Sequence, residues 1–301
     1  MTINGMPNII LLKLWFYLQC KNLHGDFFII GGGLLMLRIG LAQIDIALGK
    51  REENYRRVRN WMEQYFTPSS LATAIVLPEI WDVGYALEEG ERLADPQGSG
   101  AAAFLAGLAK EYGVWFAGGS VLAKSGAGNV NRAQVIDPTG RLVTQYDKVH
   151  LIPLMNEDRY LKAGNSEGLF EIEGVCAGCV ICYDIRFCEL LRLYAIKGAK
   201  VLFVSAEWPQ IRIDHWKALL RARAIENMMY VVACNRVGTS KETLFGGSSM
   251  VIDPWGEVLY EGGSGEEGVF VEIDPGKVQS IRDHLQVFRM RRPELYQGLS
   301  E

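Results

Sequence analysis

Short apolar runs alternate along the chain with longer segments in which apolar residues recur every three or four positions. The short runs predict buried strands, and the longer segments predict amphipathic helices. Strands that alternate with helices favour mixed α/β layers. The predicted strands are residues 37–43, 74–77, 114–117, 179–182 and 201–205, and the predicted helices are residues 52–65, 101–112, 187–197 and 214–229.

Two turn sequences of similar form predict β-hairpins. Asp-Pro-Thr-Gly occupies positions 137–140, and Asp-Pro-Trp-Gly occupies positions 253–256. In both, proline restricts φ at an early position, and glycine permits a positive φ at the last position. The strands of the first hairpin are residues 133–136 and 142–145, and those of the second are residues 249–252 and 257–260.

Composition supports one globular domain. The chain has 301 residues, 49% of them hydrophobic, and a formal net charge of −4. These values exclude a disordered chain, and the absence of a basic run argues against a nucleic-acid partner. No repeat or low-complexity linker divides residues 36–301, so we expect a single domain there. Six cysteines, four of them in one short stretch, do not form the pattern of a disulfide framework, so we expect a cytoplasmic protein.

Residues 1–35 differ in character from residues 36–301. Their apolar runs, at 9–18 and 27–37, are too short to span a membrane, and no basic n-region or small-residue cleavage site is present. We therefore expect an N-terminal extension outside the catalytic domain, and no membrane partner.

Three cysteines, Cys176, Cys179 and Cys182, succeed one another at a three-residue spacing. This spacing occurs in iron–sulfur and metal sites. In a strand, however, Cys179 would point away from the other two, because alternate side chains lie on opposite faces. A non-catalytic redox or metal-binding protein is therefore the alternative from another class, and the sequence favours a site without metal.

Cys182 ends an apolar run at the point where a helix is predicted to begin. A helix dipole there would favour the thiolate, and the first N–H groups of the helix could bind an oxyanion. Glu79 follows the strand 74–77, and Lys148 follows the first hairpin. Each residue alone also has an ordinary interpretation. Cys182 could be an inert core cysteine, Glu79 a solvated strand end, and Lys148 an exposed lysine. Together they fit one mechanism, in which Glu79 takes the thiol proton, Cys182 attacks a carbonyl carbon, and Lys148 stabilises the negative charge.

Three ordered blocks around these residues resemble the catalytic blocks of the nitrilase (carbon-nitrogen hydrolase) superfamily. They are Leu-Pro-Glu at 77–79, Tyr-Asp-Lys-Val-His-Leu at 146–151 and Cys-Tyr-Asp-Ile-Arg-Phe at 182–187. The resemblance covers residues 37 to about 274. It implies a four-layer α-β-β-α sandwich, assembled as a homodimer, and a Glu-Lys-Cys triad that needs no metal and no cofactor. It further implies that Glu157 positions Lys148 and the substrate amide, and that the backbone N–H of Tyr183 shares the oxyanion with Lys148.

The blocks also indicate a branch of the superfamily. Nitrilases resemble one another in carrying Trp-Glu after the nucleophile, whereas this chain has Tyr183-Asp184, as amidase-like branches do. Ser-Ala-Glu-Trp-Pro at 205–209, followed by Asp-His-Trp-Lys at 214–217, is similar to bacterial omega-amidases linked to methionine salvage. The alternatives are an amidase for deaminated glutathione and an N-carbamoyl amine hydrolase.

The omega-amidase branch implies a small-molecule amide substrate that carries a carboxylate and a keto group. Such a substrate needs a cation and an aromatic wall in the pocket. Arg186 could bind the carboxylate with its guanidinium fork, and Trp208 could form the wall. The competing interpretations are an ion pair of Arg186 with a neighbour such as Glu189, and a core position for Trp208.

Overall fold

The computed structural model describes residues 36–297, and the expectation for residues 1–35 falls outside this part of the chain. The described residues form a mixed α/β domain with two large sheets and a small hairpin. In spatial order, the first sheet contains β15 (Glu267–Ile273), β1 (Leu37–Gln43), β2 (Ala72–Val76), β4 (Trp115–Ser125), β5 (Gly128–Ile136) and β6 (Leu142–Asp147), with β3 (Asp95–Pro96) paired to β4.

The second sheet and the helices complete the architecture. In spatial order this sheet contains β14 (Val258–Glu261), β13 (Met250–Ile252), β10 (Tyr230–Asn235), β9 (Val201–Ala206), β8 (Val175–Ile181) and β7 (Leu169–Ile172), and the small hairpin is β11 (Val237–Ser240) with β12 (Thr243–Gly246). The helices are α2 (Arg51–Tyr65), α3 (Gly90–Leu93), α4 (Ser99–Tyr112), α5 (Glu157–Tyr160), α6 (Cys188–Ile196), α7 (Ile213–Asn227) and α8 (Gly276–Leu285).

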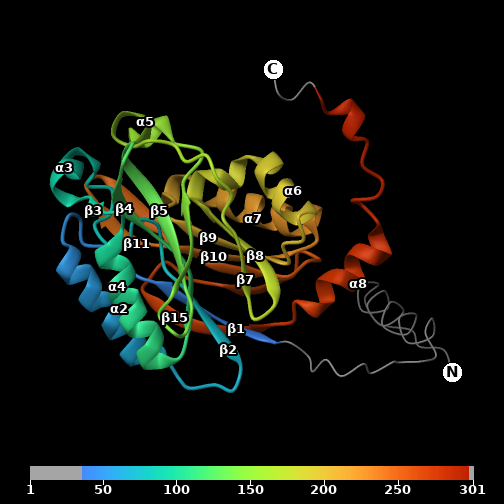
Figure 1. Ribbon diagram of the computed structural model, residues 1–301, viewed down its shortest axis with the longest axis horizontal. Helices are drawn as coiled ribbons and strands as arrows, with labels where there is room; N and C mark the ends of the chain where they lie inside the picture. The colour runs from blue at the N-terminus through green and yellow to red at the C-terminus, as the bar shows by residue number, and fades with distance from the viewer. Residues whose placement is uncertain (1–35, 298–301) are drawn as a thin grey trace. The chain divides into compact units, whose positions relative to one another are not determined.

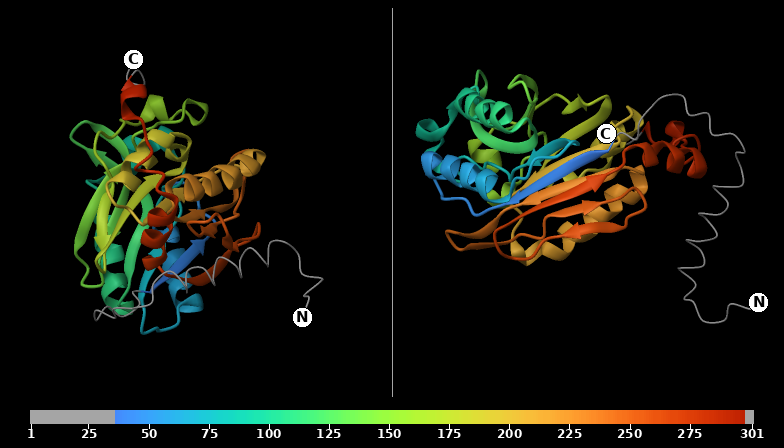
Figure 2. Two further views of the ribbon diagram at one scale, coloured as in Figure 1. Left: turned by 90° about the vertical axis from the view of Figure 1, so that its right-hand side faces the viewer. Right: turned by 90° about the horizontal axis from the view of Figure 1, so that it is seen from below.

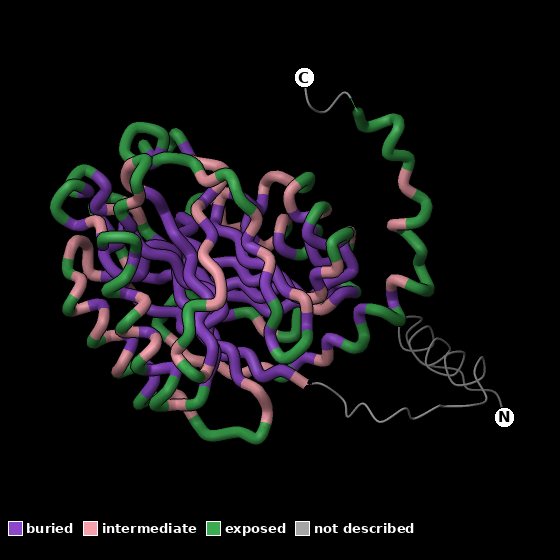
Figure 3. Tube along the Cα trace, viewed as in Figure 1, coloured by how far each residue is buried: buried purple, intermediate pink, exposed green. Residues whose placement is uncertain are grey.

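The two sheets pack face to face, and helices cover their outer faces. Figure 1 shows α2 and α4 against the first sheet and α6 and α7 against the second, and the view from below in Figure 2 shows the four layers edge-on. The purple segments in Figure 3 show that the central strands of both sheets are buried. The predicted α-β-β-α sandwich is therefore confirmed. None of the helices within residues 36–297 is long and apolar enough to cross a membrane.

Local chemistry explains the correctly predicted elements. In α2 the buried residues Asn54, Val58, Trp61 and Met62 lie on one face at helical spacing. In the turn between β5 and β6, Asp137 Oδ1 accepts hydrogen bonds from the backbone N–H groups of residues 139 and 141, at 2.9 and 3.0 Å. The second predicted hairpin forms between β13 and β14.

The strand predicted at 114–117 extends further than expected. It continues as β4 to Ser125 through Gly118 and Gly119, whose φ angles are +146° and +100°. A Cβ atom at Gly118 would lie 2.8 Å from a methyl carbon of Val76 and 3.8 Å from Cβ of Phe203 on the opposing sheet. Glycine therefore permits both a bulge and the close approach of a side chain from the neighbouring strand β2. The predicted strand 179–182 is also different, since β8 begins at Val175 and ends before Cys182.

Candidate active site

Strand ends position the candidate catalytic residues. Glu79 follows β2, Lys148 directly follows β6, and Cys182 directly follows β8. Glu157 is the first residue of the short helix α5. All four side chains are buried, although they come from both sheets and from a connecting segment.

Lys148 joins the two glutamates. Its Nζ donates to Oε1 of Glu79 at 2.7 Å and to Oε1 of Glu157 at 2.8 Å, and none of the three side chains is exposed to solvent. Burial acts to lower the pKa of Lys148, but the carboxylates of Glu157 and Glu79 outweigh burial and raise this pKa above its ordinary value. Burial raises the pKa of Glu157, while the Lys148 ammonium acts in the opposite direction. The lysine is therefore held as an ammonium ion in a site that excludes water.

Further side chains, which the sequence analysis did not predict, hold the Glu79 carboxylate. Its Oε1 accepts a hydrogen bond from Asn131 Nδ2 at 2.8 Å, and its Oε2 accepts one from the backbone N–H of Glu207 at 2.9 Å. The Tyr85 hydroxyl lies 2.8 Å from Oε1 of both Glu79 and Glu157, and its single proton can be donated to only one of them at a time. Tyr85 and Asn131 stand in no recognised motif, so only the tertiary structure identifies them.

Cys182 lies between a strand and a helical turn, as predicted, but the pKa of its thiol differs from the expectation. It opens the short 3₁₀ helix η3 (Cys182–Arg186) with φ +46°, a left-handed conformation that is uncommon for a residue with a side chain. Burial and the nearby Glu79 carboxylate raise the pKa of Cys182 well above its ordinary value, although Lys148 acts in the opposite direction. A helix dipole at this position does not produce a thiolate, because burial and the carboxylates outweigh one short turn. A base must remove the thiol proton during the reaction.

Asp184 links the turn at Cys182 to the segment that contains Lys148. Its Oδ2 accepts hydrogen bonds from the Tyr146 hydroxyl at 2.8 Å and from the backbone N–H of Ile181 at 3.0 Å. Its Oδ1 accepts one from the backbone N–H of His150 at 3.1 Å and lies 2.8 Å from His150 Nδ1. Tyr183 is the second residue of η3, so its N–H has no acceptor within the turn and is available to an oxyanion.

Arg186 and Trp208 lie together, and Trp208 is also part of the hydrophobic core, as its competing interpretation expected. The guanidinium carbon of half-buried Arg186 lies 4.9 Å from the ring centroid of buried Trp208 and 5.8 Å from that of Tyr183. Among the described residues, the Arg186 side chain has no ion pair, and Glu189 instead accepts a contact from the Cys188 thiol. The alternative of an ion pair between Arg186 and Glu189 was therefore wrong.

The cysteine cluster does not form a metal site within residues 36–297, where no group of three or more His, Cys, Asp or Glu side chains is arranged to hold an ion. Cys179 is buried in β8, and Cys176 is partly exposed on the same strand. Cys182 belongs with Glu79 and Lys148 instead. A buried thiol that interacts electrostatically with a carboxylate and an ammonium ion is suited to acyl transfer through a covalent intermediate.

Both the fold and this set of residues define a class of enzyme. Residues 38–283 match the carbon-nitrogen hydrolase family, and the chain belongs to it. Solved structures of the nitrilase superfamily share the fold. A CN-hydrolase superfamily protein of Xanthomonas campestris has a TM-score of 0.77 at 27% identity and covers 85% of this chain and 98% of its own. Nit3 of Saccharomyces cerevisiae also has a TM-score of 0.77, at 26% identity, and covers 87% of this chain and 99% of its own.

Curated relatives narrow the class to amidases. The 2-oxoglutaramate amidase of Bacillus subtilis is 44% identical over 258 residues, which are 86% of this chain and 98% of the relative. The omega-amidase NIT2 of Homo sapiens is 30% identical over 268 residues, which are 86% of this chain and 96% of the relative. The chain is therefore a carbon-nitrogen hydrolase that acts on amides.

Replacing Lys148 by Met removes the cation between two buried carboxylates. We expect the free energy of unfolding to fall by about 3–5 kcal/mol at pH 8, because each carboxylate loses its buried partner. The loss should be smaller at pH 5, because protonation removes the unpaired buried charge. Urea unfolding at both pH values measures this difference. The exposed Lys110 provides a control, since Lys110→Met should change the free energy by less than about 0.5 kcal/mol. An equal loss at both pH values would contradict the prediction.

Proposed function

We propose that this amidase hydrolyses the side amide of a small 2-oxo acid, 2-oxoglutaramate or a close analogue, to the dicarboxylate and ammonia. Two relatives bear the name 2-oxoglutaramate amidase, and others bear the name omega-amidase. The observation that carries the proposal is the half-buried Arg186 guanidinium, which lies over the Trp208 ring, belongs to the same short helix as Cys182 and has no acidic partner among the described residues. An anionic substrate would supply that partner.

Acylation begins when Glu79 takes the thiol proton of Cys182 and the sulfur attacks the amide carbon. The oxygen of the tetrahedral intermediate becomes negative, and Lys148 Nζ and the backbone N–H of Tyr183 stabilise it. Collapse of the intermediate breaks the carbon–nitrogen bond, and Glu79 returns the proton so that ammonia leaves. The product of this half-reaction is a thioester on Cys182.

Deacylation uses the same base. Glu79 removes a proton from water, the hydroxide attacks the thioester carbon, and collapse of the second intermediate breaks the carbon–sulfur bond. The thiolate of Cys182 then recovers the proton from Glu79, and the acid product leaves and releases its remaining proton to solvent to become the carboxylate. Glu157 holds Lys148 through the contact at 2.8 Å, and its Oε2 accepts the backbone N–H of Ile152 at 2.7 Å, so its role is positional.

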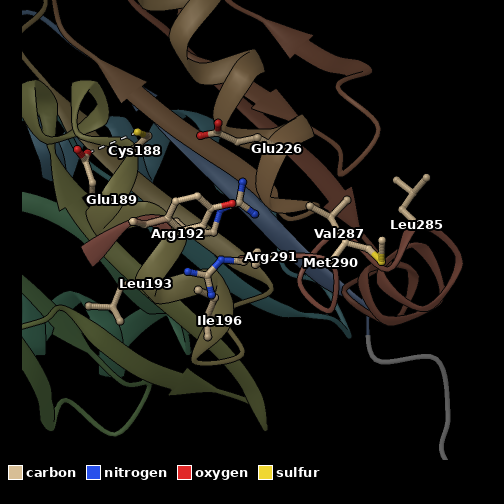
Figure 4. Close-up of a pocket in the computed structure, with 11 residues that line it drawn as sticks. Cys188, Glu189, Arg192, Leu193, Ile196, Glu226, Leu285, Val287, Met290 and Arg291 are labelled. Carbon is tan, nitrogen blue, oxygen red and sulfur yellow. Dashed lines mark hydrogen bonds between the residues drawn. The ribbon is translucent and has the colours of Figure 1, made fainter. Parts of the chain in front are cut away.

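We also propose that the enzyme is a homodimer, as its family resemblance implies. A groove of about 740 Å³ lies between α6, α7 and the segment that follows α8. Figure 4 shows the side chains that line it. Exposed apolar side chains line it, and acidic and basic side chains lie beside them, so the surface can be self-complementary in a two-fold contact. The apolar lining residues are Leu193, Ile196, Leu285, Val287 and Met290, and the charged ones are Glu189, Arg192, Glu226 and Arg291.

Replacing Cys182 by Ala should abolish ammonia release from 2-oxoglutaramate, because no thioester can form. Glu79→Gln should reduce kcat almost as far, since residues that act as a unit are not additive. Ammonia release by the purified full chain measures both, and circular dichroism confirms that the fold is intact. A nitrile, an N-carbamoyl amine and deaminated glutathione serve as comparison substrates. Turnover of one of them alone would replace the proposed substrate, whereas a Cys182→Ala enzyme of normal rate would overturn the mechanism.

Replacing Arg186 by Met should raise KM for 2-oxoglutaramate at least about tenfold, because the substrate carboxylate loses a charge-assisted hydrogen bond. A neutral linear amide of the same length should keep its KM, since it carries no carboxylate. The exposed Arg221 on α7 is a matched control, and Arg221→Met should leave both constants unchanged. An equal rise in KM for both substrates would show that Arg186 does not bind the carboxylate.

Replacing both Leu193 and Met290 by Asp should convert the dimer to a monomer, because four buried carboxylates would then face one another across the two-fold contact. Light scattering of the full chain measures the mass. Leu244 on β12 is also an exposed apolar residue but lies outside the groove, so Leu244→Asp should leave the dimer intact. A wild-type chain that has the mass of a monomer would refute the homodimer.

A further inference from the structure

Glu207 is a buried carboxylate that the proposed mechanism does not use. It directly follows β9, and its side chain is not exposed to solvent. Its backbone N–H donates to Oε2 of Glu79 at 2.9 Å, while its own Oε2 accepts a hydrogen bond from Arg236 Nη1 at 2.9 Å. Its Oε1 has no hydrogen-bond partner among the described residues. Glu207 therefore contacts the proposed general base through its main chain and presents a second carboxylate beside it.

Arg236 fixes the position of Glu207. Its Nη2 donates to Oδ1 of Asp45 at 2.7 Å and to the carbonyl of Ile46 at 2.9 Å, and its guanidinium carbon lies 4.5 Å from the ring centroid of Phe245. Arg236 is fully buried, and these contacts come from the segment after β1 and from β12. These contacts hold the Arg236 guanidinium in place. Because Glu207 is bonded to this guanidinium, the ion pair also restrains the main chain at residue 207.

The charge of Glu207 changes within the range in which the enzyme would work. Burial raises the pKa of Glu207 to about 7, Arg236 acts in the opposite direction, and the Glu79 carboxylate raises it further. The other titratable groups that interact with it are Asp45, which faces the same guanidinium, and the Tyr85 hydroxyl. The charge of Glu207 is therefore expected to change near neutral pH.

We propose that Glu207 is a positioning residue for Glu79, because the Glu207–Arg236 pair fixes the N–H group that holds Glu79 and places a second negative charge beside it. This inference rests on the proposed role of Glu79 as the base. When Glu207 is ionised, two negative charges lie close together. Transfer of the Cys182 proton to Glu79 removes one of them, so the charge of Glu207 favours this transfer. A strong acceptor is needed there, since burial raises the pKa of that thiol.

The test is the pH dependence of ammonia release by Glu207→Gln, a substitution that keeps the shape and removes the charge. We expect kcat at pH 8 to fall about tenfold, the effect of about 1.4 kcal/mol on the barrier, with KM changed less than about twofold. We also expect the wild-type rate to decline below about pH 7 and the variant to lose or shift this decline by more than about half a pH unit. Glu207→Asp, which restores the charge, should recover part of the rate.

Asp82 provides a matched control for burial and ion pairing. It is fully buried, it pairs with Arg51 at 3.0 Å, and burial raises its pKa to about 6, but its carboxylate accepts from the backbone of Leu122 and does not contact Glu79. We expect Asp82→Asn to lower Tm and to leave the pH midpoint of kcat unchanged.

Three outcomes would overturn the inference. They are a Glu207→Gln enzyme with the wild-type pH profile and kcat, a rise in KM alone, and a loss of Tm and rate with an unchanged pH midpoint, as for a purely structural residue. The assay uses whichever linear amide the wild-type chain hydrolyses, so failure with 2-oxoglutaramate would reject the proposed substrate and leave this test intact. A fully active Glu79→Gln enzyme would instead reject the proposed base.

Discussion

The buried contact between the Lys148 ammonium and two carboxylates is the interaction on which the rest of the site depends. Taking three charges out of water costs several kcal/mol per ion unless each retains close partners. The fold supplies them, because Lys148 Nζ lies 2.7 and 2.8 Å from Glu79 and Glu157 and each carboxylate accepts a further backbone N–H. In this dry environment an oxyanion near Lys148 is stabilised more strongly than it would be in water. The same environment keeps the Cys182 thiol protonated until a base acts on it.

A second constraint is the backbone at Cys182. A residue with a side chain at φ +46° is strained, and such strain persists only where neighbouring contacts determine the conformation. Asp184 supplies these contacts, since it accepts hydrogen bonds from Ile181 on one side and from Tyr146 and His150 on the other. The turn that carries the nucleophile is therefore tied to the segment that carries the lysine.

Sequence patterns predicted those elements whose causes are local. The hairpin around Asp137 was predicted from its turn residues, and α2 was predicted from the spacing of its apolar positions. The strand β15 and the helix α8 were not predicted. β15 pairs with β1 from the far end of the chain and is only half-buried, so its apolar alternation is weak. Gly118 and Gly119 did not predict a continued strand, because the side chains that leave no room for a Cβ there, those of Val76 and Leu77, come from a segment about forty residues earlier in the chain.

By itself, the sequence determined the family, the order of the three blocks and the grouping of Glu79, Lys148 and Cys182 as one candidate set. Only the tertiary structure decided how these residues contact one another, that the thiol pKa is raised, that Arg186 faces Trp208 and not Glu189, and that Tyr85, Asn131 and Glu207 surround the base. The physical reason is that burial and charge act over a few ångströms in space. The groups that set the proton affinity of Cys182 and the groups that hold Glu79 come from strand ends and loops far apart along the chain. Local sequence patterns do not predict which of these groups come into contact.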